Sequence, residues 1–115
     1  MPSELSEQVN LARELDRAHI CWFHVPNGGS RKGREAVSLR LSGVKAGIPD
    51  VLIVDRPPSY PSLPGVALEL KSLKGHTSPE QEHWLRAFAS RGWATIVAYG
   101  YEDAIAQLRV LGYRL

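Results

Sequence analysis

The chain has 115 residues, a formal net charge of +2 and a single cysteine. This length suits one domain with a real hydrophobic core, so we expect a single domain over residues 1–115. One cysteine excludes an intramolecular disulfide, and no apolar run approaches the roughly 18 residues of a membrane helix. The first residues do not resemble a signal peptide, so we expect a cytoplasmic protein that has no membrane partner.

The spacing of the apolar residues predicts a mixed α/β fold. We expect helices over about 4–18, 79–91 and 101–111, and strands over about 20–25, 51–54, 66–71 and 94–99. A further short strand is possible over 36–41, inside a basic loop. The two last strands and the helix between them predict a right-handed β-α-β crossover. The sequence thus indicates a mixed central sheet flanked by helices, in the order α-β-β-β-α-β-α.

The first predicted helix carries two acids close to its apolar face. At about 100° per residue, six apolar side chains share this broad face: Leu5, Val9, Leu11, Ala12, Leu15 and Ala18. Glu4 lies within the span of the face and Glu7 at its edge, so either carboxylate could reach inward. A solvated acid in the first turns, stabilised by the helix dipole, is an equal alternative.

Positive charge gathers ahead of the second strand. Five cations stand within fifteen residues that contain one acid, Glu35: Arg31, Lys32, Arg34, Arg40 and Lys45. Such a segment would bind DNA phosphates without reading bases, and its binding would fall steeply with salt. The alternative is a solvated basic loop.

Three charged residues stand at the ends of two apolar strands. Asp50 follows Gly47-Ile48-Pro49 and precedes the continuous apolar run 51–54, which is typical of a strand buried on both faces. Glu69 comes nineteen positions after Asp50 (69 minus 50), and Lys71 follows within the same strand. Because side chains alternate along a strand, Glu69 and Lys71 point to the same face.

Two carboxylates and a lysine suit the hydrolysis of a phosphodiester. Mg²⁺ is commonly held by one or two carboxylates with waters and substrate phosphate, and Asp50 and Glu69 suffice for that. Lys71 could orient the attacking water or offset charge that develops on the phosphate. The alternative is an ion pair between Glu69 and Lys71 with an Asp50 that only closes a turn. Unpaired charges inside an apolar strand are costly to bury, which favours a site.

The segments that follow these strands give weaker signals. Residues 55–65 contain four prolines and predict a semi-rigid loop that projects into solvent, or that contacts substrate or a second subunit. Ser78, Pro79 and Gln81 predict a capping box that starts the next helix. The N-terminal amides of that helix could receive a phosphate, assisted by Lys74 and His76.

Core packing is the default interpretation of the tryptophans and of the remaining histidines. Trp84, Leu85 and Phe88 fall on one side of their helix, which predicts their burial. The other residues of this kind show no metal-ligand spacing and are expected to pack as well: His19, Trp22, His24, His83 and Trp93. In the last helix, an apolar stripe is expected to face the sheet: Ala104, Ile105, Leu108 and Leu111.

These motifs resemble the PD-(D/E)XK nuclease superfamily and, more narrowly, its VRR-NUC family (virus-type replication-repair nucleases). The matching pieces are Glu7, Gly47-Ile48-Pro49-Asp50, Leu68-Glu69-Leu70-Lys71, and Ser78-Pro79-Glu80-Gln81 followed by Trp84. The resemblance implies a restriction-endonuclease-like core and a nuclease that uses Mg²⁺ or Mn²⁺. It also implies a homodimer that, like the Holliday-junction resolvases, cuts branched DNA.

By position, the resemblance implies a role for each matching residue. Asp50 and Glu69 would be metal ligands, and the Leu70 backbone carbonyl a third. Lys71 would be the catalytic lysine, and Glu7 would complete the acidic cluster.

The resemblance also places Gln81 near the active site, in contact with the substrate or its water. We therefore expect a metal-dependent DNA endonuclease that selects branched structures, because so short a chain has no module left to read bases. The alternatives are a general nicking or restriction-type nuclease, or a nucleic-acid-binding module without catalysis.

Overall fold

The computed structural model describes residues 3–26 and 33–115. Within these residues, four helices and four strands follow one another in the order α1 (Glu4–Arg17), β1 (Trp22–His24), α2 (Gly33–Leu41), β2 (Val51–Ile53), β3 (Val66–Lys71), α3 (Pro79–Ser90), β4 (Ala94–Tyr99) and α4 (Tyr101–Val110). The predicted mixed α/β class is confirmed, and α2 is added to the predicted order. No helix in the described ranges has the length and apolar character that crossing a membrane requires.

The strands form one mixed sheet in the order β1-β2-β3-β4. The pairs β1–β2 and β2–β3 are antiparallel, whereas β3 and β4 are parallel and are joined through α3, as predicted for this crossover. Residues Val66 to Leu70 of β3 are all buried, because this strand is central and is covered on both faces.

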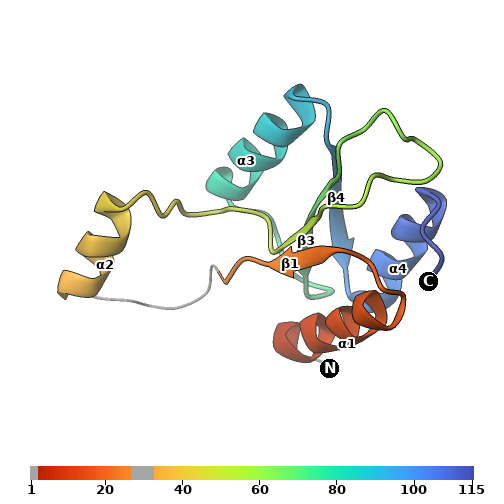
Figure 1. The fold of residues 1–115 in the computed structure, drawn as a ribbon. Helices are drawn as coiled ribbons and strands as arrows, with labels where there is room; N and C mark the ends of the chain where they lie inside the picture. Colours follow the sequence, from red (N-terminus) through yellow and green to blue (C-terminus); the bar gives the residue numbers. More distant parts are fainter. Residues whose placement is uncertain (1–2, 27–32) are drawn as a thin grey trace.

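Helices cover both faces of the sheet. Figure 1 shows α1 and α4 together on one side and α3 on the other. Leu11 and Leu15 of α1 and Leu108 of α4 are fully buried against the strands. The apolar stripe predicted for the last helix is confirmed, while Leu5 and Val9 at the start of α1 remain exposed.

Helix α2 replaces the short strand that we predicted over 36–41, and that prediction was wrong. Alternation of apolar and polar residues suggested a strand, but Arg34, Glu35 and Ala36 favour a helix, and Glu35 stands in its first turn, where the dipole stabilises an acid. None of the residues of α2 is buried. The helix projects from the rest of the molecule (Figure 1).

The proline-rich segment 55–65 is a largely exposed loop, as predicted, but its first residues are anchored to the rest of the fold. Pro57 is buried, and the Ser59 amide donates a hydrogen bond to the Leu111 carbonyl at 3.0 Å. The Tyr113 hydroxyl donates to the Asp55 carbonyl at 2.6 Å. The segment therefore packs against the residues that follow α4, because Pro57 supplies apolar surface and its neighbours supply backbone partners.

The prediction that the tryptophans and histidines pack in the core was wrong for the histidines, whereas Trp22 does pack against the core. The tryptophans are half-buried, and His19, His24 and His83 are exposed. Leu85 and Phe88 of α3 are half-buried as well. The aliphatic side chains of α1, α4 and the strands fill the core instead, so α3 keeps part of its apolar surface outside.

Candidate active site

The sheet register brings the two predicted carboxylates together. In the antiparallel pair β2–β3, Val51 is opposite Leu68, so Asp50 falls opposite Glu69 at the next position. The Asp50 Oδ2 atom accepts a hydrogen bond from the Leu70 amide at 2.8 Å. Asp50 is thereby held at the mouth of β2, directly beside the end of β3.

Glu69 is a buried acid whose two carboxyl oxygens meet no hydrogen-bond donor among the described residues. It is 1% exposed, and both of its carboxyl oxygens are themselves buried. Burial raises the pKa of Glu69 to about 9, and the neighbouring Asp50 adds to this, first as the acceptor of a hydrogen bond from the protonated Glu69 and then through its charge. A buried polar group is normally paired, since an unpaired one costs a few kcal/mol. Buried carboxyl oxygens that meet no donor are the kind of group that a cation would satisfy.

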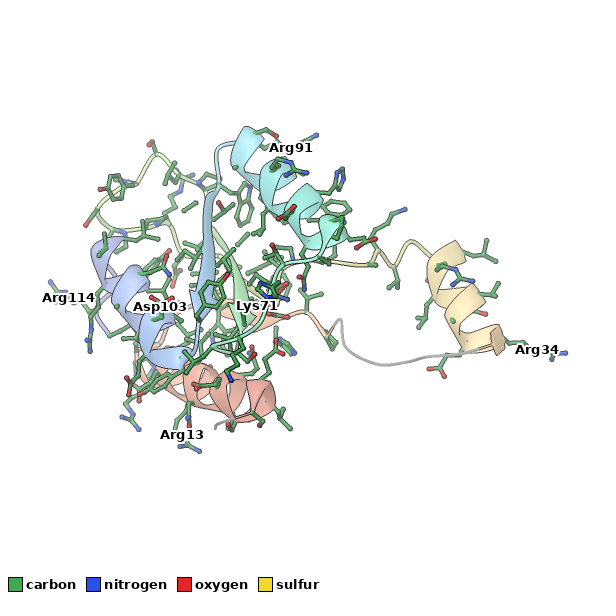
Figure 2. The ribbon with its side chains drawn as sticks, turned by 180° about the vertical axis from the view of Figure 1, so that it is seen from behind. Arg13, Arg34, Lys71, Arg91, Asp103 and Arg114 are labelled. Carbon is green, nitrogen blue, oxygen red and sulfur yellow. The ribbon has the colours of Figure 1, made fainter. Side chains whose placement is uncertain are left out.

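Lys71 ends β3 on the same side of the strand as Glu69. Its positive charge opposes the rise in the pKa of Glu69. The Lys71 carbonyl accepts a hydrogen bond from the Gly100 amide at 2.9 Å, which fixes the backbone at this position. Figure 2 shows Lys71 near the centre of the molecule, far from the tip of α2.

The donors at this end of the sheet fit a hard divalent ion. Within residues 3–26 and 33–115, no three acidic, histidine or cysteine side chains converge as a complete metal site. Mg²⁺ does not require such a set, because it usually keeps several waters and takes one or two carboxylates. Asp50, Glu69 and the Leu70 carbonyl offer that number of oxygen ligands.

The two acids of α1 have different surroundings. The Glu7 carboxylate accepts a hydrogen bond from the Tyr101 amide at 2.8 Å and so caps the start of α4, where Gly100 offers no side chain. Glu4 instead lines an open cavity of about 320 Å³ together with Asp50, and its charge contributes to raising the pKa of Glu69. The structure thus places Glu4 beside Asp50 and turns Glu7 toward α4.

His24 lies at the candidate site, a position that the sequence reasoning missed. It lies at the end of β1, lines the same cavity as Asp50, and its Nδ1 is 2.8 Å from the Asp50 carbonyl oxygen. Because a carbonyl only accepts, Nδ1 must carry the proton of this bond, and Nε2 is an acceptor whenever the ring is neutral. The preceding Trp-Phe pattern indicated a strand, but no spacing linked His24 to Asp50.

The start of α3 packs against the segment that leads to Asp50. Gly47 has a φ of +84°, and a Cβ added there would lie 2.6 Å from the Glu80 carbonyl carbon. The predicted capping box is confirmed. The backbone N–H of Gln81 donates to Ser78 Oγ at 3.2 Å, and the backbone N–H of Ser78 donates to the side-chain oxygen Oε1 of Gln81 at 2.8 Å. Gln81 therefore caps α3 close to the loop that carries Asp50.

The predicted phosphate contacts are spread over the molecule. Arg31 and Lys32 lie outside the described residues. Arg34 and Arg40 are exposed on α2, and Lys45 is exposed in the loop that follows. Lys74 and His76 are exposed between β3 and α3, at the end of the sheet where Lys71 lies.

Comparison with known proteins adds the family to this geometry. The family model of the VRR-NUC domain matches residues 3–102, a span that contains Asp50, Glu69 and Lys71. The chain belongs to the VRR-NUC family. A solved structure described as a VRR_NUC domain protein superposes with a TM-score of 0.81 at 22% sequence identity, over 97% of this chain and 89% of that one. Among curated proteins, none matches.

The family match and the structural superposition agree with each other. The VRR-NUC family is of the nuclease type, and the superposition is consistent with a nuclease core. In this VRR-NUC domain, the matched span contains the one described carboxylate that is both buried and without a hydrogen-bond donor.

Proposed function

We propose that this VRR-NUC domain is a metal-dependent, structure-selective DNA endonuclease that hydrolyses phosphodiester bonds. The observation that carries the proposal is the buried Glu69, whose free oxygens lie beside Asp50 at the end of two strands. Burying such a group is costly for a structural residue but is suited to a cation ligand.

Each residue of the site has a distinct task. Asp50, Glu69 and the Leu70 carbonyl would hold Mg²⁺ or Mn²⁺. When bound, such an ion neutralises phosphate oxygens and lowers the pKa of water. The Lys71 ammonium orients the attacking water or balances the charge that grows on the phosphate. The amide of Leu70 keeps the Asp50 carboxylate in place through their hydrogen bond.

Glu4 is our candidate for the helix carboxylate, in place of Glu7. Its side chain shares a cavity with Asp50 and His24, whereas the Glu7 carboxylate is engaged by Tyr101. His24, with its free Nε2, can accept a hydrogen bond from water or from a protonated substrate group in that cavity.

The proposed selectivity for branched DNA rests on the exposed cations and on a two-fold arrangement of two sites. Exposed cations on α2 and before α3 contact phosphates, which position DNA without reading its sequence. A homodimer would place two sites on opposite strands of a junction, because symmetric cleavage by one site per chain requires a two-fold axis. Sedimentation of the purified protein tests that arrangement.

The test is a cleavage assay with purified protein. Labelled four-way junction, flap and linear duplex DNA are incubated with Mg²⁺, Mn²⁺ or EDTA. We expect cleavage only with a metal, and faster cleavage of the branched substrates. Asp50→Asn is the matched variant, because its amide oxygen can still accept from Leu70 while the charge is lost. Cutting in EDTA, or full activity of Asp50→Asn, would refute the metal-dependent mechanism, and equal rates on all substrates would refute selectivity.

A further inference from the structure

Another cavity lies along α3, apart from the candidate active site. Its volume is about 570 Å³, within the roughly 300–1,000 Å³ range of small-molecule sites. Its principal lining side chains are aromatic or basic: Trp84, Phe88, Trp93, His83, Arg86 and Arg91. We call this cavity the α3 groove.

The aromatic side chains of the α3 groove are held in fixed positions. The Phe88 and Trp93 rings meet edge to face, with centroids 5.1 Å apart and planes at 72°. Trp93 also packs closely on Gly65, where an added Cβ would lie 2.8 Å from its ring. His83 meets Trp84 edge to face at 5.4 Å. Half-buried rings fixed in this way provide surfaces on which a flat ligand can stack without further ordering.

The charge of the α3 groove is positive. Its ionisable lining residues are two arginines and a histidine, and the described lining contains no acid. The Arg91 guanidinium is held through Nη1, which donates to the Ala87 carbonyl and to Ser90 Oγ, each at 3.0 Å. Aromatic surfaces bordered by arginines complement a ligand that combines a flat ring with an anion, which describes a nucleotide.

Gln81, which caps α3 near the loop that carries Asp50, shares one stripe of the helix with two residues of the groove. Gln81, Trp84 and Phe88 are spaced i, i+3 and i+7, so they lie on one stripe of α3. At 1.5 Å per residue, Trp84 is about 4.5 Å and Phe88 about 10 Å beyond Gln81 along the axis. Figure 2 shows Arg91 at the end of α3 that is farther from Lys71.

We propose that the α3 groove binds an unpaired nucleotide of branched DNA. The base stacks on Trp84 and its aromatic neighbours, and Arg86 and Arg91 bind the adjacent phosphates. The proposal rests on the function proposed above and deepens it, since it gives the domain a reason to prefer branched DNA. Bases of an intact duplex are already paired and stacked, so a duplex cannot use the groove.

The test measures binding without cleavage. Fluorescence anisotropy in EDTA compares a duplex that carries a single-stranded flap with the matching linear duplex. For Trp84→Ala, we expect flap affinity to fall about tenfold and duplex affinity to stay within about twofold. Trp84→Phe keeps a flat ring and should restore most of the flap affinity. For the double variant Arg86→Gln/Arg91→Gln, the slope of log affinity against log salt concentration for the flap should become about 1.4 less steep. This is the contribution of two phosphate contacts on a single strand.

Controls separate the possible outcomes. Arg114→Gln removes an exposed arginine outside the groove and should bind like wild type. The arginine pair is exposed, so its result holds even where Trp84→Ala fails to fold. If the folded groove variants keep the wild-type ratio of flap affinity to duplex affinity, the proposal is overturned. It is also overturned if these variants no longer sediment as a dimer but still prefer the flap, because the groove would then be a subunit interface. If the protein binds the flap through Trp84 but cleaves no DNA, the proposed role of the α3 groove is supported and the proposed nuclease activity is refuted.

Discussion

At the scale of single residues, the free oxygens of Glu69 determine how the molecule responds to pH. Burial and Asp50 raise the pKa of Glu69 from its ordinary 4.5 to about 9. Between these values the folded, metal-free protein holds a proton that the unfolded chain releases. The free energy of unfolding therefore falls as pH rises through this window, by at most about 1.4 kcal/mol per pH unit.

Glu69→Gln should remove this dependence, because a glutamine has no proton to hold. We expect the variant to gain stability over wild type as pH rises from about 5 to about 8 in EDTA. Urea unfolding at the two pH values measures the gain. A difference between variant and wild type that is the same at both values would show that Glu69 is not protonated in the fold.

The two acids of α1 provide a matched pair at the same scale. Glu7→Ala should lower the free energy of unfolding by about 1 kcal/mol, because the cap on the Tyr101 amide is lost. Glu4→Ala removes an exposed side chain and should leave stability nearly unchanged while it weakens Mn²⁺ binding. Urea unfolding and calorimetric titration with Mn²⁺ distinguish them. The reverse pattern would restore Glu7 as the helix carboxylate of the site.

At the scale of elements, the site depends on how closely α3 approaches the loop before Asp50. Gly47 allows this approach, through its positive φ and through the absence of a Cβ that would overlap Glu80. The strand register then sets Asp50 opposite Glu69. The positions of Asp50 and Glu69 therefore follow from backbone packing and strand register, with the hydrogen bond from the Leu70 amide holding the Asp50 side chain.

Gly47→Ala should disturb both the conformation and the contact. We expect a loss of about 1–3 kcal/mol in stability, as is typical for a strained backbone, and lower cleavage activity at temperatures where the variant is still folded. Gly43→Ala is the control, since Gly43 also has a positive φ but meets no atom within 4 Å. Equal effects of the two substitutions would show that the contact with α3 is unimportant.

The sequence predicted those features that depend on local pattern. Alternation placed Glu69 and Lys71 on one face of β3, and Ser78 with Gln81 marked the start of α3, both as observed. Side-chain hydrogen bonds between residues far apart in the sequence could not be predicted from it. The cap from Glu7 to Tyr101 spans 94 residues and the bond from His24 to Asp50 spans 26, so neither leaves a local signal. The region of α2 was mistaken because its residues alternate like a strand.

At the scale of the whole molecule, the net charge of +2 is small, so the proposed binding of DNA depends on the positions of the cations rather than on their number. Arg34 on the projecting α2 is far from Lys71 (Figure 2), and Arg40 belongs to the same helix. Both could therefore reach phosphates that the candidate site cannot. In Arg34→Gln/Arg40→Gln, the slope of log affinity against log salt concentration for duplex DNA should become about 2 less steep, whereas Arg114→Gln should leave this slope unchanged. Anisotropy titrations over a range of salt measure this slope, and an unchanged slope would exclude α2 from the DNA interface.

The most direct measurement of the proposed mechanism is the rate at which Glu69→Gln cleaves a labelled four-way junction in Mg²⁺. We expect a loss of more than about 100-fold, beyond the 10–100-fold typical of residues that only support metal ligands. Because the same substitution should stabilise the metal-free fold, unfolding cannot account for that loss. Cleavage by Glu69→Gln at the wild-type rate would contradict the assignment of Glu69 as a metal ligand.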